Sequence, residues 1–235
     1  LTSLVGSEMC IRDRKLASQK WPFQLFYWDY TFGILLITLF FAFTFGSVGD
    51  FGRSFLHDLE QAKMSNITSA FIGGIIFNFA NLLLVIAIEI AGMAIAFPIG
   101  IGIALVLGVF TNYIAQPEGD PLILIIGVIL VAVAILIDGI AYKKILQKTN
   151  ENPLKGILFS VSAGIAMGFF YKYVAASMAT DFIIPEAGRL TPYSALVIFS
   201  LGIIISSFLF NTINMYRPFS GEKVSFSDYF TMGNT

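Results

Sequence analysis

The sequence predicts an all-α fold, a polytopic transmembrane helical bundle with about six helices in this chain. Of the 235 residues, 57% are hydrophobic and only 12% are charged, and the mean hydropathy is +0.81. A soluble domain carries about a quarter charged residues, so the charge is roughly halved here. The charges also gather between apolar runs that reach the roughly 20 residues a helix needs to cross the hydrocarbon core. We therefore expect a multi-pass integral membrane protein, located in the cell (inner) membrane.

The first fourteen residues differ from the rest of the chain. Residues 1–14 read LTSLVGSEMCIRDR, which is polar and has no helical periodicity. The segment lacks the basic start, apolar middle and small-residue cleavage site of a signal peptide. It resembles a translated sequencing-adaptor read-through, so we expect residues 1–14 to be non-native. That exclusion includes Cys10, the only cysteine of the chain.

Six apolar segments follow, separated by connections rich in turn-forming and charged residues. The first begins within an aromatic cluster, WPFQLFYWDY, which is typical of a membrane–water interface. The connection at 48–66 is expected to be a loop, whereas the second and third segments are separated by Gly92 alone. Each segment predicts one helix, at 27–47, 67–91, 93–115, 121–142, 154–173 and 192–213.

Lysine and arginine predict the orientation, because cytoplasmic loops carry an excess of these residues. One side holds the start of the first helix, the loop after the fourth and the end of the sixth. It carries eight such residues: Lys15, Lys20, Lys143, Lys144, Lys148, Lys155, Arg217 and Lys223. The opposite side carries four: Arg53, Lys63, Lys172 and Arg189. We therefore expect the first side to be cytoplasmic.

Polar residues inside the hydrocarbon are costly and usually face a cavity or a partner. The helix at 67–91 carries Asn78, Asn81 and Glu89. At about 100° per residue, Asn78 and Glu89 lie about 20° apart and Asn81 about 60° away, so all three share one face. They either line a polar cavity that binds a solute, or the amides bridge neighbouring helices while Glu89 sits at the wet interface. Asp29, near the start of the first helix, either caps that helix or faces the solute.

Small residues predict where helices touch. Ser160, Gly164 and Gly168 repeat at every fourth position of the helix at 154–173 and predict a packing face. Pro98 and Gly100, early in the helix at 93–115, predict either a bent helix beside a solute or close packing of small residues. Both interpretations remain open from the sequence.

Several classes of protein are excluded or disfavoured. The single histidine, His57, rules out an HExxH-type metal site, and neither a phosphate-binding GxxxxGK[ST] loop nor a GxSxG nucleophile motif occurs. A net charge of −1 supplies no basic field for nucleic acid. We therefore expect no enzyme, no cofactor, no metal and no nucleic-acid partner.

Three stretches resemble the ureide permease family: KLASQKWPFQLFYWDYTFGILL, GRSFLHDLEQA and GGIIFNFANLLLVIAIEIAGMAIAFPIGIGIALVLG. The FYWDY and GGxxxNxAN segments carry most of the resemblance. It implies the drug/metabolite transporter superfamily, near the bacterial glucose/ribose-type sugar uptake proteins. It also implies ten helices in two inverted five-helix repeats with the solute site between them. On that pattern, residues 15–235 form a single transmembrane transporter domain truncated at both ends.

The resemblance implies a permease, a secondary transporter that moves a small polar metabolite across the lipid bilayer by alternating access. Ureides, nucleobases and sugars are the candidate solutes, with protons as a candidate coupling ion. Asn78 and Asn81 are the expected solute ligands, with Asp29 and Glu89 as further candidates for solute binding or proton coupling. A channel or a membrane scaffold without transport chemistry is the alternative.

Overall fold

The computed structural model describes residues 22–48, 52–115, 117, 119–145, 153–219 and 223–232. Residues 1–14, for which a non-native origin is expected, lie outside the described residues. Within the described part the chain forms eight helices, six long and two short. They are α2 (Phe23–Phe43), α3 (Phe55–Gln61), α4 (Met64–Ala91), α5 (Met93–Ala115), α6 (Pro121–Ile145), α7 (Pro153–Ser177), α8 (Pro192–Tyr216) and α9 (Phe226–Met232).

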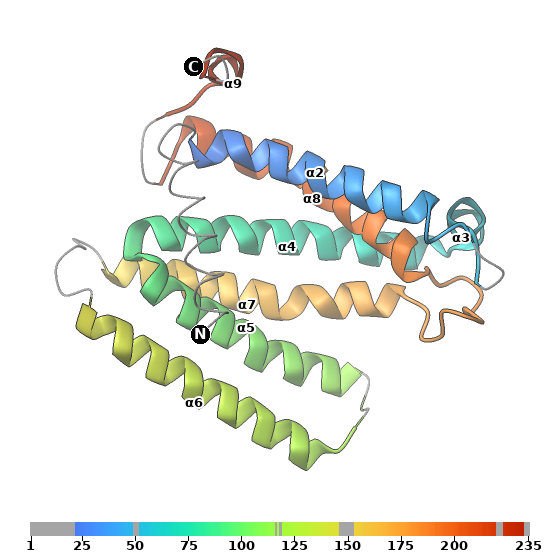
Figure 1. Cartoon of the computed structure of the whole chain (residues 1–235), viewed down its shortest axis with the longest axis horizontal. Coiled ribbons are helices and arrows are strands. Elements are labelled where there is room, and N and C mark those ends of the chain that lie inside the picture. Colours follow the sequence, from blue (N-terminus) through green and yellow to red (C-terminus); the bar gives the residue numbers. More distant parts are fainter. Residues whose placement is uncertain are drawn as a thin grey trace.

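Helix α4 lies at the centre of the bundle. It packs most extensively on α7, then on α8 and α5, while α2 packs on α8 and α6 packs mainly on α5. Figure 1 shows α2 with α8 on one side of α4, and α5 with α6 on the other. We call the end of the bundle that holds α3 the α3 end, and the opposite end, where α4 turns into α5, the Gly92 end. The lysine and arginine pattern predicts that the Gly92 end is cytoplasmic.

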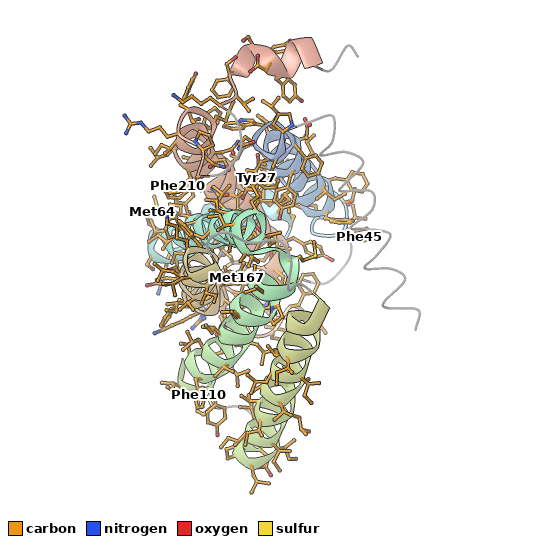
Figure 2. All side chains as sticks on the ribbon, turned by 90° about the vertical axis from the view of Figure 1, so that its left-hand side faces the viewer. Tyr27, Phe45, Met64, Phe110, Met167 and Phe210 are labelled. Atoms are coloured by element: carbon orange, nitrogen blue, oxygen red, sulfur yellow. The ribbon has the colours of Figure 1, made fainter. Side chains whose placement is uncertain are left out.

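The long helices have the dimensions of membrane spans. Five described helices, α2, α4, α5, α7 and α8, are long and apolar enough to cross a bilayer, and the apolar part of α6 is shorter, at Pro121–Ile137. Large apolar side chains cover the outside of the bundle, as Phe45 and Phe110 do in Figure 2, and both are more than half exposed. In a bilayer such surfaces contact lipid tails, so they need no protein partner. The structure confirms the predicted polytopic helical bundle.

Two local expectations differ from the structure. The first helix begins at Phe23 and not at Tyr27, so the aromatic cluster belongs to the helix itself. Asp29 therefore lies in the second turn of α2, and the prediction that it caps this helix is wrong; Pro22 occupies the cap position. The connection at 48–66 also contains α3, whose seven residues are too few to show a clear helical period in the sequence.

The predicted packing of small residues is confirmed. A side-chain carbon at Gly164 would lie 2.5 Å from the Gly100 carbonyl oxygen, and one at Gly168 would lie 2.6 Å from Leu107 Cβ. Helices α5 and α7 can therefore touch only because these positions are glycine. Helix α5 runs on through Pro98 without a break, which favours close packing over a broken helix. Gly92 joins α4 to α5 with a φ of +81°, a conformation that glycine adopts freely.

Candidate solute site

A glycine pair sets the spacing of α4 and α8 at membrane depth. A side-chain carbon at Gly74 would lie 2.1 Å from the Phe199 carbonyl oxygen, and one at Gly202 would lie 2.3 Å from the Phe71 carbonyl oxygen. No other residue fits at either position without moving a backbone. The two helices run in the same direction, so residues one turn further along each helix also face each other. Those residues are Asn78 on α4 and Ser206 on α8.

Asn78 is fully buried and joins three helices through its amide. Its Nδ2 donates to Ser206 Oγ at 2.7 Å, and its Oδ1 accepts from the Tyr27 hydroxyl at 2.5 Å and from Ser207 Oγ at 3.4 Å. Tyr27 comes from α2 and the two serines from α8. Because Asn78 lies at the middle of the 28-residue α4, these bonds form far from the water on either side. Every polar atom that Asn78 buries there has a partner.

Asn81 extends the same set of contacts but is only half-buried. Its Nδ2 donates to Tyr27 Oη at 3.3 Å, so the Tyr27 hydroxyl accepts from one asparagine and donates to the other. We call Tyr27, Asn78, Asn81, Ser206 and Ser207 the amide cluster. Within it, Asn78 is enclosed by protein, whereas part of Asn81 remains accessible. Figure 2 shows Tyr27 in the region where α2, α4 and α8 meet.

The residues contributed by α8 are absent from the sequence prediction. Ser206, Ser207 and Asn211 are all buried, and Asn211 Nδ2 donates to the Gln24 carbonyl oxygen at 2.8 Å. The Asn211 Oδ1 is buried without a hydrogen-bond partner among the described residues. A buried acceptor without a donor costs about 1–3 kcal/mol, so this oxygen calls for a donor such as water or a solute N–H or O–H. The criterion that singled out Asn78, a polar residue inside an apolar run, would also have selected these three.

The comparison with known proteins identifies the chain through one family. The family model for ureide permeases matches residues 26–144, about half of the chain. The chain belongs to the ureide permease family. No curated protein and no solved structure matches it. The family points to transport of small polar metabolites rather than to enzyme catalysis, and with the apolar helices it establishes a multi-pass integral membrane protein.

The permease family match includes all four residues that the sequence proposed for the site, but the structure places them apart. Asn78 and Asn81 meet in the amide cluster. Asp29 is exposed on α2 and accepts a hydrogen bond from the Tyr229 hydroxyl of α9. Glu89 is exposed in the last turn of α4, about 12 Å along the helix axis from Asn81. Among the described residues no cluster of His, Cys, Asp and Glu could hold a metal ion.

A second polar network closes the α3 end of the permease. Asp58 of α3 is fully buried; its Oδ1 accepts from Arg53 Nε at 2.9 Å and its Oδ2 accepts from the Thr191 backbone N–H at 2.7 Å and the Thr191 hydroxyl at 3.0 Å. Arg53 also donates to the carbonyl oxygens of Pro185, Glu186 and Arg189. We call Arg53, Asp58, Gln61 and Thr191 the Asp58 network. It ties the connection between α2 and α4 to the connection between α7 and α8.

Proposed function

We propose that this member of the ureide permease family is a secondary transporter that moves a ureide, a nucleobase or a sugar by alternating access. We further propose that the protein belongs to the drug/metabolite transporter superfamily and that its solute site is the amide cluster. The observation that carries it is the pair formed by Asn81 and Tyr27 at membrane depth. Secondary transporters bind their solutes near the bilayer midplane, at polar groups that would be costly in a purely structural helix.

Asn81 is the proposed direct solute ligand. An amide offers both a donor and an acceptor, which matches the N–H and C=O groups of ureides and nucleobases and the hydroxyls of sugars. Asn81 uses its amide nitrogen on Tyr27 and is only half-buried, and its carbonyl oxygen makes no hydrogen bond with the described residues, so we assign that oxygen to solute binding. Tyr27 is fully buried, so in this state it orients Asn81 and does not itself contact the solute.

Asn78 holds the proposed site together and contacts the solute only through a rearrangement. Its bonds to Tyr27, Ser206 and Ser207 fix the distance between α2, α4 and α8. In this state it orients the Tyr27 hydroxyl towards Asn81. In alternating access those bonds are the ones that a solute could replace, which keeps Asn78 in the proposed site.

Asp29 and Glu89 are proposed as proton-coupling carboxylates, or as solute ligands in another state of the cycle. Both lie on helices that contribute to the amide cluster, and each is exposed in this structure. Carboxylates within or beside membrane spans commonly serve as proton relays. Tyr229, the hydroxyl donor to Asp29, would leave that carboxylate when α9 moves.

The test is uptake by the full-length protein in proteoliposomes, with and without an inward proton gradient. The solute panel comprises allantoin, uracil, hypoxanthine, glucose and rhamnose. Uptake of any of these supports transport, and stimulation by the gradient supports proton coupling. No uptake of any solute by protein that is folded and inserted would contradict the proposal.

Two variants assign the site. Asn81→Leu should raise KM at least about tenfold, because it removes about 1.4 kcal/mol or more of solute binding. Thermal stability should fall only slightly, since the contact between helices that is lost is the 3.3 Å hydrogen bond to Tyr27. Asn78→Leu should abolish uptake while membrane insertion stays intact. Phe79→Leu places leucine on an exposed face of the same helix and serves as the control. Normal uptake by Asn78→Leu and Asn81→Leu would remove the amide cluster from the site.

A further inference from the structure

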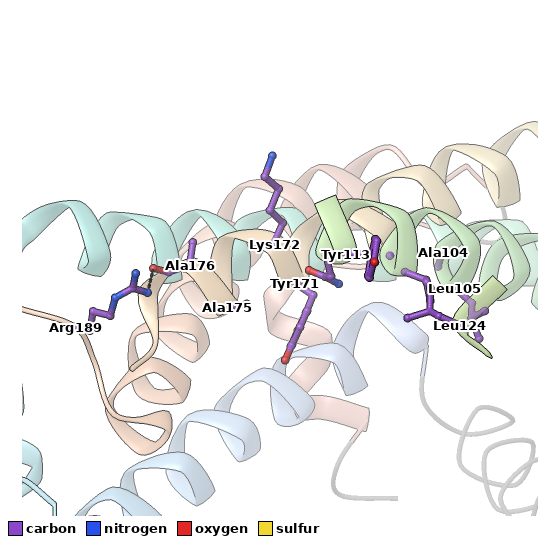
Figure 3. A pocket seen from close by; sticks show the side chains of 12 residues that line it. Ala104, Leu105, Tyr113, Leu124, Tyr171, Lys172, Ala175, Ala176 and Arg189 are labelled. Carbon is purple, nitrogen blue, oxygen red and sulfur yellow. Dashed lines mark hydrogen bonds between the residues drawn. The ribbon is translucent and has the colours of Figure 1, made fainter. Parts of the chain in front are cut away.

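A cavity opens between α5 and α7 at the α3 end of the bundle. Its volume is about 640 Å³, within the range of sites that hold small molecules. Leu124 of α6 and Arg189 of the connection between α7 and α8 complete its wall (Figure 3). None of its lining residues belongs to the amide cluster, so the cavity is separate from the proposed solute site.

The cavity opens where the small-residue face of α7 ends. Thr111 Oγ1 of α5 still contacts the Gly168 carbonyl oxygen at 3.2 Å, so the helices touch at that level. One turn further along α7, the position equivalent to Gly164 and Gly168 is occupied by Lys172. It lies about 40° around the helix from Gly168, so Lys172 continues the face that packs on α5. Lys172 of α7 and Tyr113 of α5 both line the space between the two helices at this level.

The charge of the cavity is positive. Among the described residues, Lys172 and Arg189 are the charged ones that line it, and no described carboxylate does. Arg189 is already compensated: its Nε lies 3.3 Å from Glu186 Oε2, and its NH1 donates to the Ala176 and Met178 carbonyl oxygens. Lys172, by contrast, makes no hydrogen bond or ion pair with any residue in the part of the chain that the structure describes. The cavity therefore carries one positive charge that no described residue balances.

The remaining lining suits a flat ring. Tyr113 and Tyr171 contribute aromatic rings, Asn112 contributes an amide, and Ala104 and Gly108 are small residues that take up little of the space. Figure 3 shows Lys172 and Tyr171 extending from α7 in opposite directions, with Tyr113 on α5. We propose that this cavity is a binding site for a small planar organic anion, with Lys172 contacting the negative group and Tyr113 the ring. The flexible stem of lysine lets the ammonium reach a ligand anywhere along the cavity.

The test compares two probes that share one ring. Orotate is uracil with a carboxylate, so the pair isolates the contribution of the negative charge. Binding of each radiolabelled probe is measured on the full-length protein in nanodiscs of phosphatidylcholine. We expect orotate to bind at least about tenfold more tightly than uracil, and its binding to weaken as salt is raised.

Variants then assign the charge to its residue. Lys172→Gln should weaken orotate binding at least about tenfold and leave uracil binding unchanged. Lys172→Arg keeps the positive charge, so it should bind orotate nearly as tightly as the wild type. Lys155→Gln, at the other end of α7, is the matched control because Lys155 is also exposed, and it should bind orotate like the wild type. Equal binding of orotate by the wild type and Lys172→Gln would overturn the proposal.

A lipid headgroup carries the same negative chemistry and is tested separately. If the wild type fails to bind orotate but retains phosphatidylglycerol through purification in a way that Lys172→Gln does not, the cavity is a lipid site and the proposal is overturned. The measurement is binding and not uptake, so it stands apart from the function of the amide cluster. Orotate binding that survives Asn78→Leu, in a variant without uptake, would leave this site in place while the transport proposal is judged by its own assay.

Discussion

Replacing Asp58 with asparagine keeps the size of the side chain but removes the negative charge that faces the Arg53 guanidinium. Each carboxylate oxygen accepts two bonds: Oδ1 from Arg53 Nε and Gln61 Nε2, Oδ2 from the backbone N–H and hydroxyl of Thr191. An asparagine amide has one oxygen, so in either orientation two donors face its NH₂ group. Arg53 retains its three carbonyl partners and is 15% exposed, which limits the loss.

The expected cost is about 3 kcal/mol, the lower end of the range for breaking a buried ion pair by removing one partner. For a chain of this size that corresponds to a fall in Tm of about 6–12 °C. The assay is thermal unfolding of the purified protein in detergent, followed by circular dichroism or by size-exclusion chromatography after heating. Glu60→Gln is the control, because the Glu60 side chain is 80% exposed and its contact to His57 is 3.9 Å long. Exposed pairs contribute at most about 1 kcal/mol.

A double-mutant cycle separates the ion pair from the rest of the Asp58 network. Arg53→Gln and Asp58→Asn should each destabilise the protein, and together they should cost less than the sum of the two, because the second change removes a group that the first left unpaired. A fall in Tm below about 2 °C for Asp58→Asn, or strict additivity in the cycle, would refute the reasoning. Either result would mean that Asp58 and Arg53 do not hold the two connections together.

Three further predictions follow from single contacts. Gly74→Val should lower Tm by about 2–12 °C because its side chain would meet a carbonyl oxygen of α8, whereas Gly33→Val, with open space around it, should melt like the wild type. Asn211→Leu should change Tm by less than about 2 °C, since it removes an unpartnered buried oxygen along with one bond, but should lower uptake if that oxygen binds solute or its water. The pKa of Tyr229 is raised above its usual value of about 10, chiefly by its hydrogen bond to Asp29, so its contribution to stability is present below pH 10 and is lost as pH rises through the raised pKa. Thermal unfolding measured between about pH 9 and 12 should therefore show a loss of stability in the wild type that Tyr229→Phe lacks. Identical stability profiles for the two proteins would contradict the contact.

The helices could be predicted from the sequence because the bilayer imposes a length. Apolar runs of about 20 residues have few alternatives in a chain with so little charge, and five of them appear as spanning helices. The ends of the helices are harder to predict. The aromatic residues from Phe23 to Trp28 suit both a membrane interface and a helix, and they form the first turns of α2. Helix α3 was missed because seven residues present barely two turns of pattern.

The candidate site could be predicted only on one helix. Angles around α4 placed Asn78, Asn81 and Glu89 on one face, yet Asn78 is buried and Glu89 is exposed. The angle of a residue around the helix does not say how deep in the membrane it lies, and Glu89 lies about 16 Å further along the axis than Asn78. The partners of Asn78 could not be predicted, since Tyr27 and Ser206 lie 51 and 128 residues away in the chain. Their contact depends on how α2 and α8 are rotated, which one sequence does not report.

The polar residues of α8 fix its position against α2 and α4 at several depths. Ser200 contacts Thr38 of α2 at 3.0 Å, Ser206 contacts Asn78 of α4, and Asn211 contacts the α2 backbone at Gln24. If α8 slid by one turn, the position of Ser206 would be taken by Gly202 or Phe210, and neither side chain can bond the Asn78 amide. An amide left without a partner in an apolar surrounding costs several kcal/mol. The same slide would also put Ile198 or Ser206 in the place of Gly202, where a side-chain carbon would lie 2.3 Å from the Phe71 carbonyl oxygen. The register of these helices is therefore determined by this glycine contact together with their few polar residues.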